Sequence, residues 1–519
     1  GLAGLRARSG ATGPGRTQSH GLQDIGIFVV VAVLAALACR WTFDGFIFNG
    51  DEVANTYQAD VYGHFRAYGP VPACPSMFEN YWVFRHEGRA FSQYTPGWPI
   101  FMATFQRLGV IWLAGPTMAG IVAVGVARLS RRLAWGLGGT TEETAAIVRL
   151  AGPLGAALAF LGPSMLLNGA SRFSHTMVCA CFAWAVECAC VVSETKISHR
   201  RAWGYGLLLG AATAFGVATR PADGGMLGVG VFSYFVWALL RGRVGWRVLA
   251  GTALTFLFVS GLTATILKLQ LGAWFKTAYS ISGSIHPEAE LKLSPPAPHQ
   301  IKLAIPLAVG SYCWWPAGLA LGLAGHVQAL GGRERRVVFM LITSIVVLMG
   351  FYSFVEFGRF SYDGLGPRYV LPTVVVIAPG TAALLASPMR GFALGLRRGI
   401  RFRARLRSTS LALALVLCLG AGIYRLAPFI YPGARSESMG ATAPLRGAAE
   451  LGLKNAIVIL EPGKVPADVT NLAQNAPFDE HPNVLFLTHR SAADEACARR
   501  EFPGRTWYRA GRTESLVSY

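Results

Sequence analysis

The first long apolar run of the chain, IGIFVVVAVLAALACRWTF at Ile25–Phe43, decides its class. A helix needs roughly 20 apolar residues to cross a bilayer, and this run approaches that length. It is followed by the motif NGDE at Asn49–Glu52. Two adjacent carboxylates at the mouth of a membrane helix are costly to desolvate, so they are not packing residues. They are either solvated loop charges or functional groups, with Asp51 as a candidate general base at the membrane surface.

The composition places the chain among membrane proteins. Of its 519 residues, 53% are hydrophobic and 14% are charged, and the mean hydropathy is +0.41. Globular chains carry about 25% charged residues. A net charge of +20 would suggest a nucleic-acid partner in a soluble protein. Here the arginines gather between apolar runs, as they do in the cytoplasmic loops of helical membrane proteins, so we expect no nucleic acid.

Five basic clusters predict the orientation of the chain. If these clusters and the N-terminus are cytoplasmic, one pair of spans must separate each from the next, which predicts eleven spans. The clusters lie at 128–132, 196–201, 241–247, 333–336 and 390–407. The predicted spans lie near 24–43, 115–134, 144–167, 174–193, 203–219, 223–240, 247–271, 303–325, 337–356, 368–387 and 409–430.

The stretch 96–113 is also apolar, but counting it as a span would move the first basic cluster outside. Its start, PGWP at 96–99, suits a helix that lies in or dips into the outer leaflet, because tryptophan favours the headgroup level. We therefore expect a short interfacial helix within a large first external loop, 44–114.

The chain changes character after residue 430. Strand candidates at 456–460, 483–488 and 506–509 alternate with helix candidates at 465–473 and 492–502, which predicts a small α/β domain outside the membrane. The predicted fold class is an all-α polytopic membrane protein with this small C-terminal α/β domain. Its parts are a disordered cytoplasmic tail at 1–23, a transmembrane domain at 24–430 and a soluble domain at 431–519.

The nine cysteines divide by location. Four share one predicted membrane helix, where cysteine acts as a small hydrophobe rather than a metal ligand. These four are Cys179, Cys181, Cys188 and Cys190. Only Cys74 and Cys497 fall in predicted external segments. A bridge between them is chemically allowed there, but the pairing cannot be read from sequence.

An ordered set of motifs lies on the predicted external side. The motifs are Asp51-Glu52, QYTPGWP at 93–99, SHT at 174–176, RPAD at 220–223 and GPRYVLP at 366–372. In this order they resemble the polyprenyl-phosphate-sugar-dependent GT-C glycosyltransferases, in particular the ArnT-like and protein-mannosyltransferase-like branch of family 39. The resemblance covers about 24–385. It implies a helical membrane domain, a large first external loop with a catalytic acid at its start, and a site facing the periplasm or lumen.

Asp51 matches the catalytic acid of that family. Its implied role is to take the proton from an acceptor hydroxyl as the oxygen attacks the anomeric carbon. An inverting enzyme needs such a base opposite the leaving group, which here would be a lipid phosphate. Glu52 would orient the acceptor or tune Asp51.

The leaving phosphate requires cations at the bilayer surface. Arg220 and Arg368, each beside a proline at a predicted span boundary, are the main donor-phosphate candidates, and Arg172 and Arg359 are secondary ones. A planar guanidinium suits phosphate because it binds two oxygens at once. The alternative for boundary arginines is that they reach to lipid headgroups.

Four further residues are substrate-binding candidates: Tyr94, His175, Asp223 and Tyr369. His175 stands where many relatives carry a second acid, and it is a substrate hydrogen-bonder, a metal ligand or a structural residue. A divalent metal therefore stays open, and no other cofactor is expected. The alternative for Asp223 is pairing with Arg220, three residues away.

These observations predict a glycosyltransferase that moves a sugar from a polyprenyl-phosphate donor to lipid A, another envelope glycan or a protein. The resemblance implies the bacterial inner membrane, with membrane lipids as partners and with the site and C-terminal domain in the periplasm. Two alternatives stay open. A lipid or glycan transporter should show internal repeats and polar residues inside its spans. A non-catalytic subunit of an envelope complex would use the C-terminal domain for docking.

Overall fold

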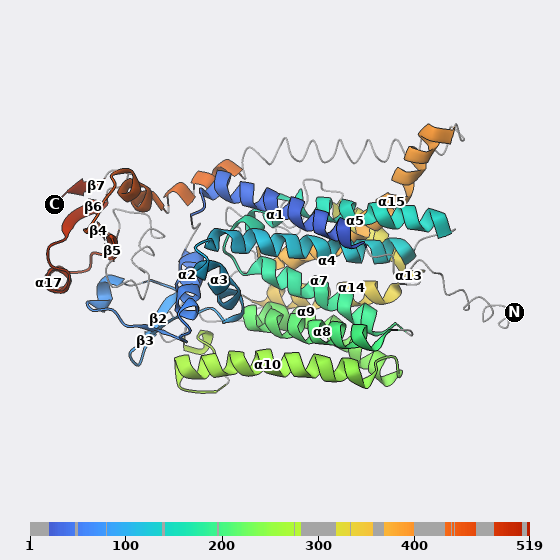
Figure 1. Ribbon diagram of the computed structural model, residues 1–519, viewed down its shortest axis with the longest axis horizontal. Coiled ribbons are helices and arrows are strands. Elements are labelled where there is room, and N and C mark those ends of the chain that lie inside the picture. Colours follow the sequence, from blue (N-terminus) through green and yellow to red (C-terminus); the bar gives the residue numbers. More distant parts are fainter. Residues whose placement is uncertain are drawn as a thin grey trace.

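The structure is a computed structural model, and it describes most of the chain. The described residues are 20–46, 50–78, 80–136, 141–194, 197–274, 276–281, 318–332, 334–355, 368–398, 431–436, 438–440, 442–462, 482–510 and 516–518. A bundle of long helices occupies one part of the molecule, and two small sheets lie beyond one end of it (Figure 1). We call the end that carries the sheets and α2 (Gly50–Gly63) the α2 end.

Seven helices in the described part are long and apolar enough to cross a membrane. They are α1 (Gly21–Phe43), α4 (Ala114–Gly136), α7 (His175–Val192), α8 (His199–Thr219), α9 (Pro221–Leu240), α10 (Trp246–Leu271) and α14 (Arg335–Phe354). Each matches a span predicted from the sequence to within a few residues. The protein is therefore a multi-pass membrane protein.

The span predicted at 144–167 is broken in the structure. It consists of α5 (Thr141–Phe160) and α6 (Pro163–Ala170), which meet at a bend of 77°. The break falls at Leu161 and Gly162, directly before Pro163. Proline lacks the amide hydrogen that would continue the α5 hydrogen bonds, and it disfavours helix in the residue before it.

Two more predicted spans are described in part. α13 (Gly318–Leu330) covers the end of the span predicted at 303–325. The span predicted at 368–387 begins as the 3-10 helix η4 (Arg368–Thr373) and continues as α15 (Val374–Arg398). The span predicted at 409–430 and the helix predicted at 465–473 lie outside the described residues, so the count of eleven stays a prediction.

Small residues allow the helices to approach closely. α4 lies centrally and packs against α1, α5, α7 and α15, whereas α10 packs mainly against α8 and leaves most of its surface open. A Cβ at Gly210 of α8 would lie 2.2 Å from the carbonyl oxygen of Thr252 in α10. Such contacts between small residues hold membrane helices together, because lipid provides no hydrophobic force between them.

The end of the bundle opposite α2 holds a group of buried ion pairs. Arg131 Nη1 lies 2.6 Å from Asp24 Oδ1, and Arg132 Nε lies 2.5 Å from Glu187 Oε2. These contacts bring the start of α1 and the ends of α4 and α7 together. The arginine cluster predicted at 128–132 therefore lies at this opposite end.

The loop between α1 and α4 folds into its own small structure. It contains α2, β1 (Gly69–Pro70), η1 (Pro75–Phe78), β2 (Val83–His86), β3 (Arg89–Ser92), α3 (Gly97–Arg107) and η2 (Ile111–Leu113). The strands form an antiparallel sheet in the order β1-β3-β2. α3 has 11 residues and rises only about 16 Å, too short to cross a bilayer, in agreement with the prediction that 96–113 is not a span.

The C-terminal segment contains the predicted strands. β4 (Ala456–Leu460) lies between β5 (Val484–Thr488) and β6 (Thr506–Ala510), parallel to both, and β7 (Leu516–Ser518) runs antiparallel to β6. The predicted helix at 492–502 is α17 (Ala492–Glu501). The five residues of β4 are all buried, as expected for the central strand of a covered parallel sheet.

The C-terminal sheet is attached to the first loop. Cys74 and Cys497 form a disulfide bond, which the sequence left open. Met77 and Phe78 pack against Ile457, Leu485 and Trp507 of the sheet.

Candidate active site

The site is built around the first turn of α2. Asp51 and Glu52 occupy this turn, where the sequence predicted a loop. Ala54, Tyr57 and Val61 of α2 pack on Val83 and Ala90 of the neighbouring sheet, which fixes the helix in place. The N-terminus of a helix carries partial positive charge, so it favours carboxylates in the first turn.

Asp51 forms an ion pair with Arg368. Arg368 Nη1 lies 3.0 Å from Asp51 Oδ2, and the two side chains are 13% and 14% exposed. The Arg368 guanidinium carbon lies 4.6 Å from the centre of the Phe173 ring. The structure therefore brings together two of the predicted site residues, 317 positions apart in the chain.

Arg220 is the second cation of the site, and Tyr369 links it to the first. The guanidinium carbons of Arg220 and Arg368 lie 5.2 Å and 5.6 Å from the centre of the Tyr369 ring. Such cation–π contacts stabilise a guanidinium and hold its orientation. Two guanidinium groups therefore meet on one tyrosine ring, and each of them also pairs with a carboxylate.

The Asp223 carboxylate is hydrogen-bonded to two side chains of the same site. It accepts short hydrogen bonds from Arg220 Nε and from the Tyr352 hydroxyl. This is the pairing alternative that the sequence left open for Asp223, and it holds the Arg220 side chain. Tyr352, near the end of α14, was missed by the sequence analysis because one tyrosine at the end of an apolar helix gives no signal of its own.

His175 is buried at the start of α7, beside the two arginines. It is 3% exposed, and neither ring nitrogen has a hydrogen-bond partner among the described residues. Its ring makes edge contacts with Phe173 at 5.9 Å and Tyr369 at 5.7 Å. Arg220 and Arg368 both lie within electrostatic range of it. Buried polar atoms without partners are costly, so this ring is a natural place for a ligand contact.

This environment does not fit a divalent metal. His175 lies near two arginines, whose positive charge repels a metal ion. It also contacts two aromatic rings, which provide no anionic ligand. In the described part of the chain, no group of three or more His, Cys, Asp or Glu side chains could hold a metal ion. The four cysteines predicted to share a helix all lie on α7 and are free thiols.

Glu52 and Arg172 serve the backbone rather than the open site. Glu52 is 1% exposed and accepts a short hydrogen bond from the Arg172 backbone amide. The Arg172 side chain donates to Thr56 Oγ1 at 3.2 Å and to the Gly45 carbonyl at 3.0 Å. These contacts tie α2 to the segment before α7 and hold Asp51 in place. Arg359 lies outside the described residues.

Tyr94 lies near the ion pair. Burial raises its pKa well above the usual range, and the charge of Asp51 raises it further. The hydroxyl therefore stays protonated at neutral pH and can donate a hydrogen bond. Its ring contacts that of Tyr279 at 6.5 Å, and Tyr279 lies within electrostatic range of both Asp51 and Arg220. Tyr279 was not among the predicted site residues.

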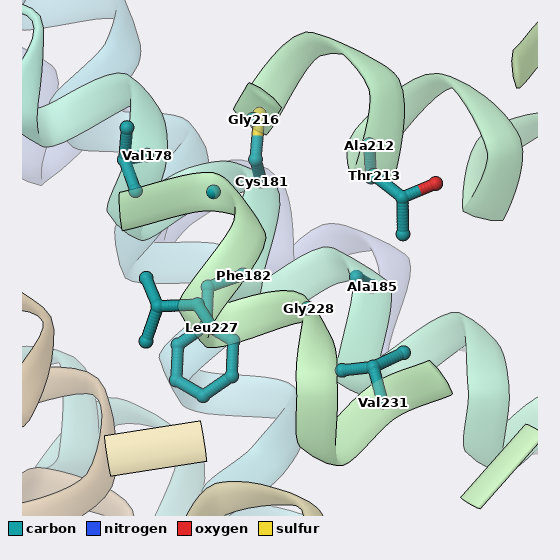
Figure 2. Close-up of a pocket in the computed structure, with 11 residues that line it drawn as sticks. Val178, Cys181, Phe182, Ala185, Ala212, Thr213, Gly216, Leu227, Gly228 and Val231 are labelled. Carbon is teal, nitrogen blue, oxygen red and sulfur yellow. The ribbon is translucent and has the colours of Figure 1, made fainter. Parts of the chain in front are cut away.

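An apolar cavity lies between α7, α8 and α9. It is small, with about 20 Å³ of free volume and an open mouth, and its lining is mainly apolar. Figure 2 shows its side chains, among them Val178, Phe182, Leu227 and Val231. Val178 lies one helical turn from His175, and Gly224 directly follows Asp223. One end of the cavity therefore lies within a helical turn of His175 and Asp223.

Comparison with known proteins identifies the fold. No protein-family model matches the sequence, and no curated protein is similar to it. The crystal structure of ArnT from Cupriavidus metallidurans bound to undecaprenyl phosphate matches with a TM-score of 0.56 at 12% identity, over 95% of this chain and 93% of that one. An oligosaccharyltransferase from Archaeoglobus fulgidus, tethered with an acceptor peptide, gives a TM-score of 0.46 at 11% identity, over 95% and 69%. The likeness to ArnT shows that the chain has the GT-C fold.

Proposed function

We propose, from the GT-C fold and the Asp51–Arg368 pair, that this protein is an inverting membrane glycosyltransferase. It transfers a sugar from a polyprenyl-phosphate donor to an acceptor at the α2 end. The observation that carries this proposal is the meeting of Asp51 with two arginines and a buried histidine, one helical turn from a small apolar cavity. A carboxylate can act as a base, arginines bind phosphate, and an apolar cavity can receive a lipid chain.

Asp51 is the proposed general base. The acceptor oxygen forms a bond to the anomeric carbon while the bond from that carbon to the phosphate oxygen breaks. The acceptor proton passes to Asp51, and the bonding electron pair leaves with the lipid phosphate. The incoming oxygen and the leaving phosphate lie on opposite faces of the sugar, which inverts the configuration.

Arg368 and Arg220 are the proposed phosphate ligands. They stabilise the charge that grows on the phosphate as it leaves. Tyr369 holds both guanidinium groups, and Asp223 and Tyr352 hold Arg220 from behind. His175 and Tyr94 supply neutral hydrogen-bond donors to the donor substrate. Glu52 and Arg172 position α2, and Arg359 is kept as a further phosphate ligand on the sequence motif alone.

The cavity between α7, α8 and α9 is the proposed entry for the carrier lipid. Its mouth is open and its lining is mainly apolar, so the first isoprene units of a polyprenyl chain can lie against it. ArnT has been crystallised with undecaprenyl phosphate, which is the carrier we propose here.

The proposed orientation puts the α2 end outside the cytoplasm. The arginines and acids of the opposite end then face the cytoplasm, in line with the positive-inside rule. The disulfide between Cys74 and Cys497 requires an oxidising compartment for the first loop and the C-terminal segment. We place the protein in the bacterial inner membrane, with a transmembrane domain at 24–430 and a periplasmic domain at 431–519.

The test is transfer by the purified protein in liposomes supplied with polyprenyl-phosphate sugars of different kinds. Mass spectrometry of the lipids and acceptors should find new glycosides and released polyprenyl phosphate. A transporter would instead move the intact lipid to the other leaflet without forming a glycosidic bond. Lipid-linked glycans that accumulate in cells lacking the protein would identify the sugar.

A further inference from the structure

The pairing of Asp51 with Arg368 raises a question about the proposed reaction. A general base has to face the acceptor hydroxyl in order to take its proton. Yet Arg368 Nη1 lies 3.0 Å from Asp51 Oδ2, so the base is paired with the cation that the donor phosphate needs. The Arg368 guanidinium would therefore have to pair with Asp51 and also bind the donor phosphate.

We infer that the donor phosphate competes with Asp51 for Arg368, so that donor binding releases the base for the acceptor. This inference rests on the proposed function and adds an order of events to it. Without donor, the Arg368–Asp51 pair neutralises both groups. With donor, Arg368 turns to the phosphate and Asp51 faces the acceptor hydroxyl.

The surroundings of Arg368 allow this exchange. Its guanidinium rests on Phe173 at 4.6 Å and beside Tyr369 at 5.6 Å, so ring contacts can hold it while its partner changes. Arg220, on the same tyrosine, is kept in place by Asp223 and Tyr352. A phosphate between the two arginines would gain both cations, whereas Asp51 pairs with Arg368 and Arg220 pairs with Asp223.

The other groups around Asp51 do not take over this role. Glu52 is committed to the backbone amide of Arg172, and Tyr94 keeps its proton because burial raises its pKa. The exchange therefore concerns Asp51, Arg368 and the phosphate. One consequence is an ordered reaction in which the donor binds before the acceptor can be deprotonated.

Binding of undecaprenyl phosphate to the full-length protein in nanodiscs tests this competition. Asp51→Asn removes the charge that competes for Arg368 but keeps the shape of the side chain, so we expect the affinity to rise about fivefold, which corresponds to about 1 kcal/mol. In an Arg368→Met background, the same Asp51→Asn change should give no gain. Arg368→Gln is a second background, and the melting temperature of each variant is measured alongside.

Asp60→Asn is the matched control. Asp60 lies on the same helix and accepts a hydrogen bond from Gln106 at 3.2 Å, away from the two arginines. Its substitution should leave affinity for undecaprenyl phosphate unchanged.

Two results would overturn the inference while leaving the proposed function in place. One is unchanged affinity in Asp51→Asn. The other is an equal gain with and without Arg368, which would mean that Asp51 repels the phosphate directly. A folded wild-type protein that does not bind undecaprenyl phosphate would instead remove the proposed function itself, and the inference with it.

Discussion

The two ends of the helix bundle both carry buried arginines, but in different settings. At the end opposite α2, Arg131 and Arg132 lie against the carboxylates of Asp24 and Glu187, and Glu194 adds a second contact to Arg132 at 3.2 Å. At the α2 end, Arg220 and Arg368 also have one carboxylate each. The number of ion pairs alone does not show which end of the bundle is the binding site.

The difference lies in what surrounds the pairs. The α2-end arginines share the ring of Tyr369, and a buried histidine beside them has no hydrogen-bond partner among the described residues. A small apolar cavity begins about one helical turn from that histidine. The opposite end joins helix to helix through the pairs themselves. Buried ion pairs inside a membrane protein are functional candidates by default, and this comparison shows which additional features favour a binding site.

The largest expected effect comes from Asp51→Asn. Loss of the general base should lower transfer by about 10²- to 10⁴-fold, and a rate per mole of folded protein separates this effect from any loss of stability. The measurement is the transfer rate per mole of folded protein in liposomes. Transfer at the wild-type rate would remove Asp51 as the base, and Asp60→Asn should keep full activity.

At the opposite end, Glu187→Ala should act on stability instead. It leaves Arg132 buried without its main partner, which costs roughly 3–5 kcal/mol. Denaturation in detergent measures the loss. The transfer rate of the molecules that remain folded should stay near that of the wild type.

Glu194→Ala is the matched control for this end, because Glu194 contacts the same arginine but its side chain is 29% exposed. Its cost should be clearly smaller than that of Glu187→Ala. A strong loss of transfer in folded Glu187→Ala protein would contradict the division between the two ends.

Removal of the disulfide should have an intermediate effect. Cys74→Ser with Cys497→Ser should cost about 2–4 kcal/mol and loosen the C-terminal sheet from the first loop. Limited proteolysis near residues 70–80 reports the loosening. Met77 and Phe78 remain packed on the sheet, so the helices should keep their melting behaviour. Equal protease resistance with and without the bond would show that this packing alone holds the two parts together.

The smallest predicted effect is that of His175→Phe. The change keeps a ring of similar size between Phe173 and Tyr369 but removes both ring nitrogens, so affinity for undecaprenyl phosphate should fall about tenfold through one lost hydrogen bond to a charged group. Stability should stay equal or rise, because no polar atom is then buried without a partner. A loss of stability with unchanged affinity would make His175 a structural residue.

The sequence predicted the parts of the fold that depend on composition. Apolar runs located the long helices, and the spans expected between the arginine clusters include the seven long apolar helices of the described part. Alternating strands and helices after residue 430 predicted β4, β5, α17 and β6. These features follow from local composition and periodicity, which one sequence contains.

Features set by tertiary contacts could not be predicted in the same way. The first turn of α2 was assigned to a loop, although two acids before Val53, Ala54 and Tyr57 fit the start of a helix. The bend at Leu161 and Gly162 had a local signal in Pro163, which the search for long apolar runs passed over. The partnership of Tyr352 with Asp223 depends on the packing of α14 against α9, which no local pattern reveals.

The most direct test of the central claim is a structure of this protein with undecaprenyl phosphate bound. We predict a phosphate that accepts hydrogen bonds from Arg368 and Arg220 beside Tyr369, with its lipid chain entering the cavity between α7, α8 and α9. Asp51 should then lie farther from Arg368 than the 3.0 Å of the ligand-free pair. A phosphate at the Arg131 and Arg132 end, or one out of reach of both Arg220 and Arg368, would contradict this account.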